Sequence, residues 1–251
     1  MGVTSGLSLV VYGNLRMLLP GMTVLIARLD VEGEVALIAD GCASDSRRPE
    51  ECALKDEWKT ARLNDQLAVG FAGHVDYGNQ IMCRLFGRRD LQSQRGNIRV
   101  VRAFEAEGLE LPTAKWHETK RALTDLMQEL KVGISRQRPS DPTVVPMDLT
   151  MMMAGSNDGE PSICLWHAQY QWQPVEVGPE VPGRRGATVC VGPGGRALAP
   201  HGVFEDPSRP LEDRAIVAIA HAAAASPGAV NEYTTVRRLS RKFVLEIYAA
   251  D

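Results

Sequence analysis

The chain has 251 residues, of which 44% are hydrophobic and 24% are charged, and its formal net charge is -3 at pH 7. This composition is typical of a folded globular protein and unlike that of disordered or fibrous chains. The small net charge gives no basic footprint for nucleic acid, and no apolar run approaches the roughly 20 residues that a membrane-spanning helix needs. A chain of this length predicts a single domain.

The cysteines and histidines show no spacing that indicates a disulfide framework or a metal site. The five cysteines are an odd number without a CxxC pair, which favours reduced thiols in the cytoplasm. The five histidines lack an HExxH or paired spacing, so we expect no metal. His221 lies in an apolar stretch and is interpreted as a core residue. No ATP-binding motif is found, and we expect no cofactor.

The first 22 residues show neither a two-residue nor a 3.6-residue hydrophobic period. The apolar run 7–11 has no basic segment before it and no small-residue cleavage site after it, which argues against a secretory signal. We interpret residues 1–22 as a leader, a propeptide or a start of translation placed too early. Residues 23–251 are expected to form the single domain.

From Thr23 onwards, short apolar runs bounded by Asp, Glu and Gly predict buried strands. The runs 23–29 and 34–39 are joined by a predicted hairpin turn at 30–33. The polar segment 44–51 contains Pro49, so we expect a loop there. A third strand-like run extends from residue 59 to residue 73.

After Gly73 the hydrophobic period becomes helical. It predicts helices at about 76–88 and from Thr113, a good N-cap residue, to about 134. Farther on, the sequence predicts a hairpin from 147–154 and 162–168, strands near 175 and at 187–191, a turn at 192–195 before a small helical patch, a helix at 211–225, an edge strand at 233–236 and a closing strand or helix at 239–250. This order of elements predicts an α+β fold, with two packed sheets between helical layers.

The threonine that begins the first strand has a plausible chemistry. A threonine hydroxyl needs a base, and if Thr23 were the first residue its α-amino group, with an unperturbed pKa of about 7.7 to 8, would be that base. A nearby lysine cation would favour the neutral amine. Lys59 is the candidate cation, and Asp40 is the candidate that holds Lys59 in place. We interpret Cys42 as a small buried residue rather than as an alternative thiol nucleophile.

The segment from Thr23 to about Phe86 resembles proteasome β subunits and, more closely, the bacterial heat-shock peptidase of that family, which forms two rings and partners an unfoldase. The stretch 39–44, Ala-Asp-Gly-Cys-Ala-Ser, is similar to the family's acid-Gly-x-x-Thr segment. The stretch 58–73 resembles its lysine-containing strand that ends in Ala-Gly. The resemblance implies the N-terminal-nucleophile hydrolase fold, which is a four-layer αββα sandwich.

Carried across residue by residue, the resemblance implies roles for individual positions. Thr23 would be the nucleophile, Asp40 and Lys59 would be its supporting pair, and the backbone N–H of Gly73 would be the oxyanion donor. The implied substrate-binding residues are Ser44, Phe71 and Val75.

The implied function is hydrolysis of peptide bonds in peptides or unfolded proteins, in a homo-oligomeric ring that a separate ATPase could feed. Two departures from the family pattern leave alternatives open: Pro193 replaces a serine, and no acid stands near Ala223 and Ser226. The alternatives are a non-catalytic ring or scaffold subunit and an amidohydrolase of small substrates. If translation begins at Met22, removal of that methionine would expose Thr23.

Overall fold

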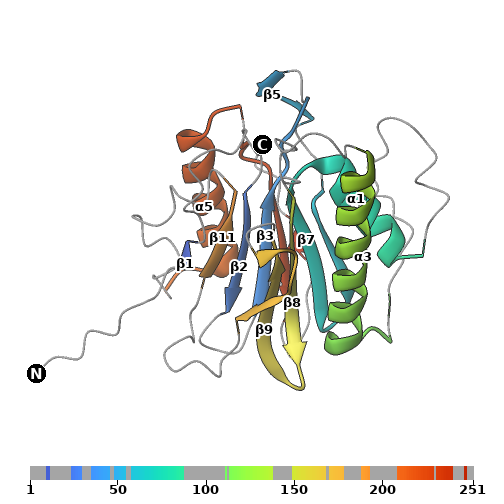
Figure 1. Cartoon of the computed structure of the whole chain (residues 1–251). Helices are drawn as coiled ribbons and strands as arrows, with labels where there is room; N and C mark the ends of the chain where they lie inside the picture. Colours follow the sequence, from blue (N-terminus) through green and yellow to red (C-terminus); the bar gives the residue numbers. More distant parts are fainter. Residues whose placement is uncertain are drawn as a thin grey trace, which may run out of the picture.

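Two β-sheets form the centre of the structure, a computed structural model (Figure 1). The structure describes residues 10–11, 24–29, 35–45, 48–54, 58–87, 111, 113–137, 149–167, 170–177, 188–192, 208–228, 230–239 and 246–247. Thr23 and Pro193 lie outside these residues, as do the turn expected at 30–33 and the helical patch expected after residue 195.

The first sheet has six strands in the order β1-β11-β2-β3-β12-β13. In that order they are Val10–Val11, Thr188–Val191, Leu25–Leu29, Val35–Asp40, Thr234–Leu239 and Glu246–Ile247. Neighbouring strands are antiparallel except β1, which runs parallel to β11. The prediction of an edge strand at 233–236 was wrong, because β12 lies between β3 and β13. One of these partners, β3, is about 200 residues earlier in the chain, so no local pattern could indicate the pairing.

The second sheet has five antiparallel strands in the order β10-β9-β8-β7-β6. In that order they are Val175–Val177, Glu160–Trp166, Leu149–Asn157, Leu67–Gly73 and Thr60–Asn64. The predicted hairpin over 147–168 is confirmed, with a tighter turn than expected, since only residues 158–159 separate β8 from β9.

The single strand-like run expected over 59–73 is instead a hairpin of β6 and β7. The side chain of Asn64 reverses the chain: its Oδ1 accepts hydrogen bonds from the N–H groups of Gln66, at 2.8 Å, and Leu67, at 3.0 Å. Asparagine favours such turns because its side chain can imitate a backbone acceptor. Apolar residues continue on both sides of the turn and conceal it in the hydrophobic pattern.

The loop expected at 44–51 was also wrong, since β4 (Ala43–Asp45) and β5 (Arg48–Leu54) pair as a small two-stranded sheet. Among the strands that the structure describes, each of these two pairs with the other alone. A proline that lacks an N–H is tolerated on such an edge, so Pro49 does not prevent strand pairing. The pairing is irregular, with register shifts on either side of Ser44.

Three helices are found in the described ranges: α1 (Val75–Leu85), α3 (Trp116–Gln137) and α5 (Leu211–Ala225). The first two begin and end within about three residues of their predicted bounds, and α5 has the predicted bounds. Helices α1 and α3 lie side by side against the second sheet, and α5 lies on the other side of the molecule, against the first sheet (Figure 1). None of these helices is long and apolar enough to span a membrane.

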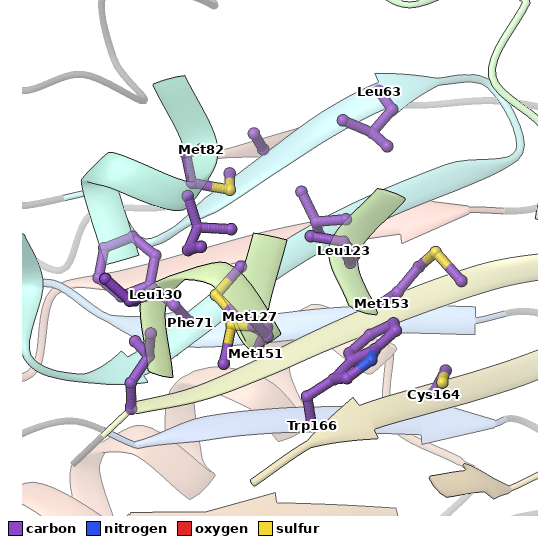
Figure 2. Close-up of a cluster of buried hydrophobic side chains, with 14 of the residues drawn as sticks. Leu63, Phe71, Met82, Leu123, Met127, Leu130, Met151, Met153, Cys164 and Trp166 are labelled. Atoms are coloured by element: carbon purple, nitrogen blue, oxygen red, sulfur yellow. The ribbon is translucent and has the colours of Figure 1, made fainter. Parts of the chain in front are cut away.

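Apolar side chains fill three spaces between these elements. One cluster lies between the second sheet and helices α1 and α3 and is rich in methionine and tryptophan (Figure 2). A second joins the two sheets, and a third lies between the first sheet and α5. Along β2, Leu25 and Ala27 belong to the cluster between the sheets, and Ile26 belongs to the cluster under α5. Strands buried on both faces explain the near-continuous apolar runs in the sequence.

Two helical glycines give a matched test of the packing between β7 and α1. A Cβ on Gly78 would lie 2.3 Å from Cδ2 of the buried Phe71 ring, whereas a Cβ on Gly133 in α3 would have no heavy atom within 4 Å. We therefore expect Gly78→Ala to lower the free energy of unfolding by about 1–3 kcal/mol through overpacking. Gly133→Ala should raise it by about 0.5–1 kcal/mol. Urea unfolding of both variants measures the difference, and equal effects would contradict the Gly78 contact.

Candidate active site

A buried ion pair connects the two sheets. Lys59 Nζ lies 3.0 Å from Asp40 Oδ1, and both side chains are completely buried. Asp40 is the last residue of β3 in the first sheet, and Lys59 directly precedes β6 in the second. Breaking such a pair leaves one charge buried without compensation. Each partner therefore offsets part of the cost of burying the charge of the other. The structure contains the contact between Asp40 and Lys59 that the sequence analysis expected. The catalytic roles of the two residues stay predictions.

The Asp40 carboxylate also holds two backbone segments. Its Oδ1 accepts a hydrogen bond from the N–H of Val24, and its Oδ2 accepts one from the N–H of Cys42, both at 2.9 Å. Burial raises the pKa of Asp40, and this rise is opposed by the Lys59 ammonium and by the two N–H groups. Asp40 therefore joins the start of β2, the turn after β3 and the lysine of the other sheet.

The position of Val24 relates this ion pair to Thr23, the preceding residue. The Val24 N–H donates to Asp40, and the Val24 carbonyl accepts a hydrogen bond from the Asp40 N–H at 3.3 Å. The peptide that follows Thr23 is thus fixed against the acid of the ion pair. Thr23 itself lies outside the described residues, and its role as nucleophile stays a prediction.

Gly73 ends β7 with a φ of 100°, in the region that favours glycine over residues with a Cβ. Two residues earlier, the Phe71 N–H donates to the Lys59 carbonyl at 3.0 Å. N–H groups two residues apart on a strand point to the same edge, so the Gly73 N–H is directed to the edge where Lys59 enters the sheet. Its role as oxyanion donor stays a prediction.

The three residues expected to bind substrate lie in different environments. Ser44 is in β4, within the irregular pairing with β5. Phe71 is completely buried in the cluster under α1 and α3, with its ring against Gly78 (Figure 2). Val75 begins α1 and packs, half-buried, against the same cluster. The location of Phe71 gives it a packing role, and the assignment of all three to a substrate pocket stays a prediction.

The sequence analysis missed the segment between α5 and β12, which reaches this site. Asn231 Oδ1 accepts a hydrogen bond from the N–H of Gly41, the residue after Asp40, at 3.0 Å. The Tyr233 hydroxyl accepts one from the indole N–H of Trp58, the residue before Lys59, at 2.9 Å. The partners are 190 and 175 positions apart in the chain, so no local pattern could indicate these contacts.

The expectation that the cysteines form no disulfide was wrong for Cys42, which is disulfide-bonded. Disulfides depend on distance in the folded chain, which cysteine spacing in the sequence does not report. The bond removes the Cys42 thiol as an alternative nucleophile in this structure. Because disulfides are uncommon in a reducing cytoplasm, the cytoplasmic location stays a prediction.

The histidines gave one further correction. His221 is exposed on α5 rather than buried in the core, because other residues, among them Ile219 and Ala222, form the buried face of that helix. His74, directly after Gly73, is exposed and lies against Tyr77, with ring centroids 4.3 Å apart. Within the described ranges, no group of three or more His, Cys, Asp or Glu residues could hold a metal ion.

Comparison with known proteins finds similarity in the fold. No protein-family model and no curated protein matches the sequence. A eukaryotic HslV from Trypanosoma brucei is similar with a TM-score of 0.53 and 16% identity, over 87% of this chain and 99% of that one. The Anbu complex from Pseudomonas aeruginosa, a helical assembly, has a TM-score of 0.57 and 12% identity over 90% of this chain and 81% of that one.

Anbu, the ancestral β-subunit, from Yersinia bercovieri has a TM-score of 0.52 and 14% identity, over 86% of this chain and 80% of that one. Identities this low show a common fold and nothing more specific. The α+β architecture of the present chain is therefore similar to that of these HslV and Anbu proteins.

Removing both charges of the buried pair should cost less stability than the sum of the two single removals. We expect Asp40→Asn or Lys59→Met alone to lower the free energy of unfolding by about 3–5 kcal/mol, because the remaining group is left uncompensated. The double variant should lose less than the sum by about 1–3 kcal/mol. Urea unfolding measures all three.

The exposed pair formed by Lys120 and Glu176, whose side chains are 27% and 38% exposed, provides the control. Glu176→Gln should change the free energy of unfolding by less than about 1 kcal/mol, since solvent screens such pairs. Additive effects of the two substitutions in the Asp40–Lys59 pair would contradict the coupling.

Proposed function

We propose that this chain is an N-terminal threonine hydrolase that cleaves peptide bonds. The observation that carries the proposal is the Asp40 carboxylate, which holds both Lys59 and the backbone N–H of the residue after Thr23. A buried acid could hold a lysine anywhere in a protein. Here the same carboxylate also accepts the N–H of Val24, which follows in sequence the residue whose hydroxyl and α-amine would form a complete nucleophile and base.

The proposed reaction uses groups from four residues. The Thr23 hydroxyl attacks the carbonyl carbon of the substrate, and its α-amine accepts the proton. The Gly73 N–H donates to the developing oxyanion. The amine then returns the proton to the leaving nitrogen, and water releases the acyl group from Thr23. Lys59 contributes a positive charge that favours the neutral form of the amine, and Asp40 fixes that charge.

The finer features of the fold and assembly belong to the same proposal. The two sheets with α1 and α3 on one side and α5 on the other support a four-layer αββα sandwich formed by residues 23–251. The fold similarity to a helical assembly of Anbu supports a homo-oligomer. Peptides or unfolded proteins would be the substrates, with a separate ATPase supplying them.

One observation favours a second candidate, a non-catalytic subunit that keeps its leader. Val10 and Val11 form β1, which pairs in parallel with Val189 and Cys190 at the edge of the first sheet. Part of the expected leader is thus integrated in the folded structure, and while residue 22 remains attached Thr23 has no free amine. The two candidates differ in whether Thr23 ever becomes the first residue.

The nucleophile is tested with protein that begins at Thr23. We expect this protein to hydrolyse unstructured peptides and to form a covalent adduct with a peptidyl epoxyketone, which requires both the free amine and the hydroxyl. Thr23→Val, which keeps the shape of the side chain, should lower kcat/KM by at least about 10³-fold and give no adduct. Peptide kinetics and intact mass measure these effects.

Two further comparisons complete this test. Thr23→Ser retains a hydroxyl and should still form the adduct. If protein beginning at Thr23 forms no adduct while remaining folded, the non-catalytic candidate is favoured. Faster hydrolysis of small amides than of peptides would instead identify an amidohydrolase.

Hydrolysis should decrease on the acid side of its pH profile as the Thr23 α-amine, with an ordinary pKa of about 7.7 to 8, becomes protonated and can no longer act as the base. The Lys59 ammonium favours the neutral amine, so it lowers the pH at which this loss occurs. Measurement of kcat from about pH 4 to pH 9 should show this limb, and Lys59→Met should move it to higher pH. An acid limb at the same pH in Lys59→Met would show that Lys59 does not act on the amine.

A further inference from the structure

One short segment contacts the chain neighbours of both members of the buried ion pair. Asn231 precedes β12, and its Oδ1 accepts the N–H of Gly41, which directly follows Asp40. In addition, Thr234 at the start of β12 stands opposite Asp40 in the strand pairing. Asp40 is therefore held by the strand pairing with β12, and the residue after it is held by a side chain from the same segment.

The lysine side of the pair is held from the same segment. Tyr233 accepts the indole N–H of Trp58, the residue before Lys59, at 2.9 Å. Arg237 is completely buried, and its guanidinium carbon lies 5.2 Å from the centroid of the Trp58 ring, within the range of a cation–π contact. Its Nη2 donates to the carbonyl of Thr60, the residue after Lys59, at 3.2 Å.

The spacing of these side chains follows from strand geometry. Residues 233, 235 and 237 alternate with their neighbours and so lie on one face of the first sheet. Leu37 stands opposite Arg237 in β3 and belongs to the cluster between the sheets, which identifies this face as the one turned toward the second sheet. The segment thus bridges the two sheets at the place where the ion pair does.

We propose that Asn231, Tyr233 and Arg237, here called the 231–237 clamp, are positioning residues for the Asp40–Lys59 pair. The clamp fixes the residue after Asp40 and the residues on both sides of Lys59. It thereby sets the direction in which the Lys59 side chain points and keeps its ammonium group buried. Its effect on hydrolysis rests on the proposed function, whereas its effect on Lys59 does not.

Two mild substitutions test the clamp. Tyr233→Phe keeps the ring but removes the acceptor for Trp58, and Asn231→Ala removes the acceptor for Gly41. Asn231→Asp keeps an acceptor oxygen and serves as the conservative rescue. Asn157→Ala is the matched control, because Asn157 stands at the opposite end of β8 from the residue that pairs with Gly73.

The readout that is independent of activity is acylation of Lys59 by an amine-reactive ester, followed by peptide mass spectrometry. The exposed Lys115 is the internal standard for reagent, and alkylation of the buried Cys164 thiol reports unfolding of the whole molecule. We expect Tyr233→Phe and Asn231→Ala to increase acylation of Lys59 relative to Lys115 by about three- to tenfold, with Cys164 as protected as in the unsubstituted protein.

Kinetics on protein beginning at Thr23 give the second readout. Each of the two variants should lower kcat by about three- to tenfold with little change in KM, because a displaced ammonium alters the reactive amine rather than substrate contacts. Asn231→Asp should retain the protection of Lys59, and Asn157→Ala should change neither readout.

The outcomes separate the clamp from the proposed function. The clamp would be overturned if Lys59 were acylated no faster in Tyr233→Phe and Asn231→Ala than in Asn157→Ala. It would also be overturned if acylation of Lys59 and alkylation of Cys164 increased together, because that result means a general structural role. Should the unsubstituted protein have no hydrolytic activity, the acylation result still decides whether the clamp positions Lys59, and only the proposed function fails.

Discussion

The buried ion pair between Asp40 and Lys59 is the constraint on which the arrangement of the two sheets depends. Its partners enter from different sheets, and neither side chain is exposed. A charge removed from water is tolerable only with its counterion and hydrogen-bonding partners in place. The ends of β3 and β6 must therefore meet at one point, with the start of β2 close enough for the Val24 N–H to reach the same carboxylate.

Stability alone does not explain such a pair. An apolar pair of similar volume is often equally stable in a protein interior, because desolvation of the two ions offsets much of their attraction. What an apolar pair cannot provide is a fixed positive charge on the same carboxylate that holds the Val24 N–H. The proposed role of Lys59 is to favour a neutral amine on Thr23. That role would explain why an ion pair stands here rather than an apolar pair.

Apolar and polar side chains occupy different parts of the interior. The clusters under α1 and α3, between the sheets, and under α5 consist of apolar side chains. The completely buried polar residues instead gather where β3, β6 and β12 approach one another; they are Asp40, Lys59, Thr60, Thr234, Thr235 and Arg237. The apolar layers hold the sheets together, and the 231–237 clamp is placed to adjust the ion pair within that rigid frame.

The sequence by itself determined the element types, since the hydrophobic period depends on which faces are buried: it predicted α1, α3 and α5, the β8–β9 hairpin and the α+β class. It also singled out Asp40, Lys59 and Gly73, through a resemblance confined to one stretch. It did not predict the Asn64 turn or the pairing of β4 with β5, because apolar or polar runs continue across those boundaries. It did not predict the inner position of β12 either, because that position depends on pairing with β3, which is distant in the chain.

Only the tertiary structure decided that Cys42 is disulfide-bonded and that Asn231 and Tyr233 reach the neighbours of the ion pair. Those contacts join residues up to 190 positions apart, and their energy arises from burial that exists only after the two sheets have closed.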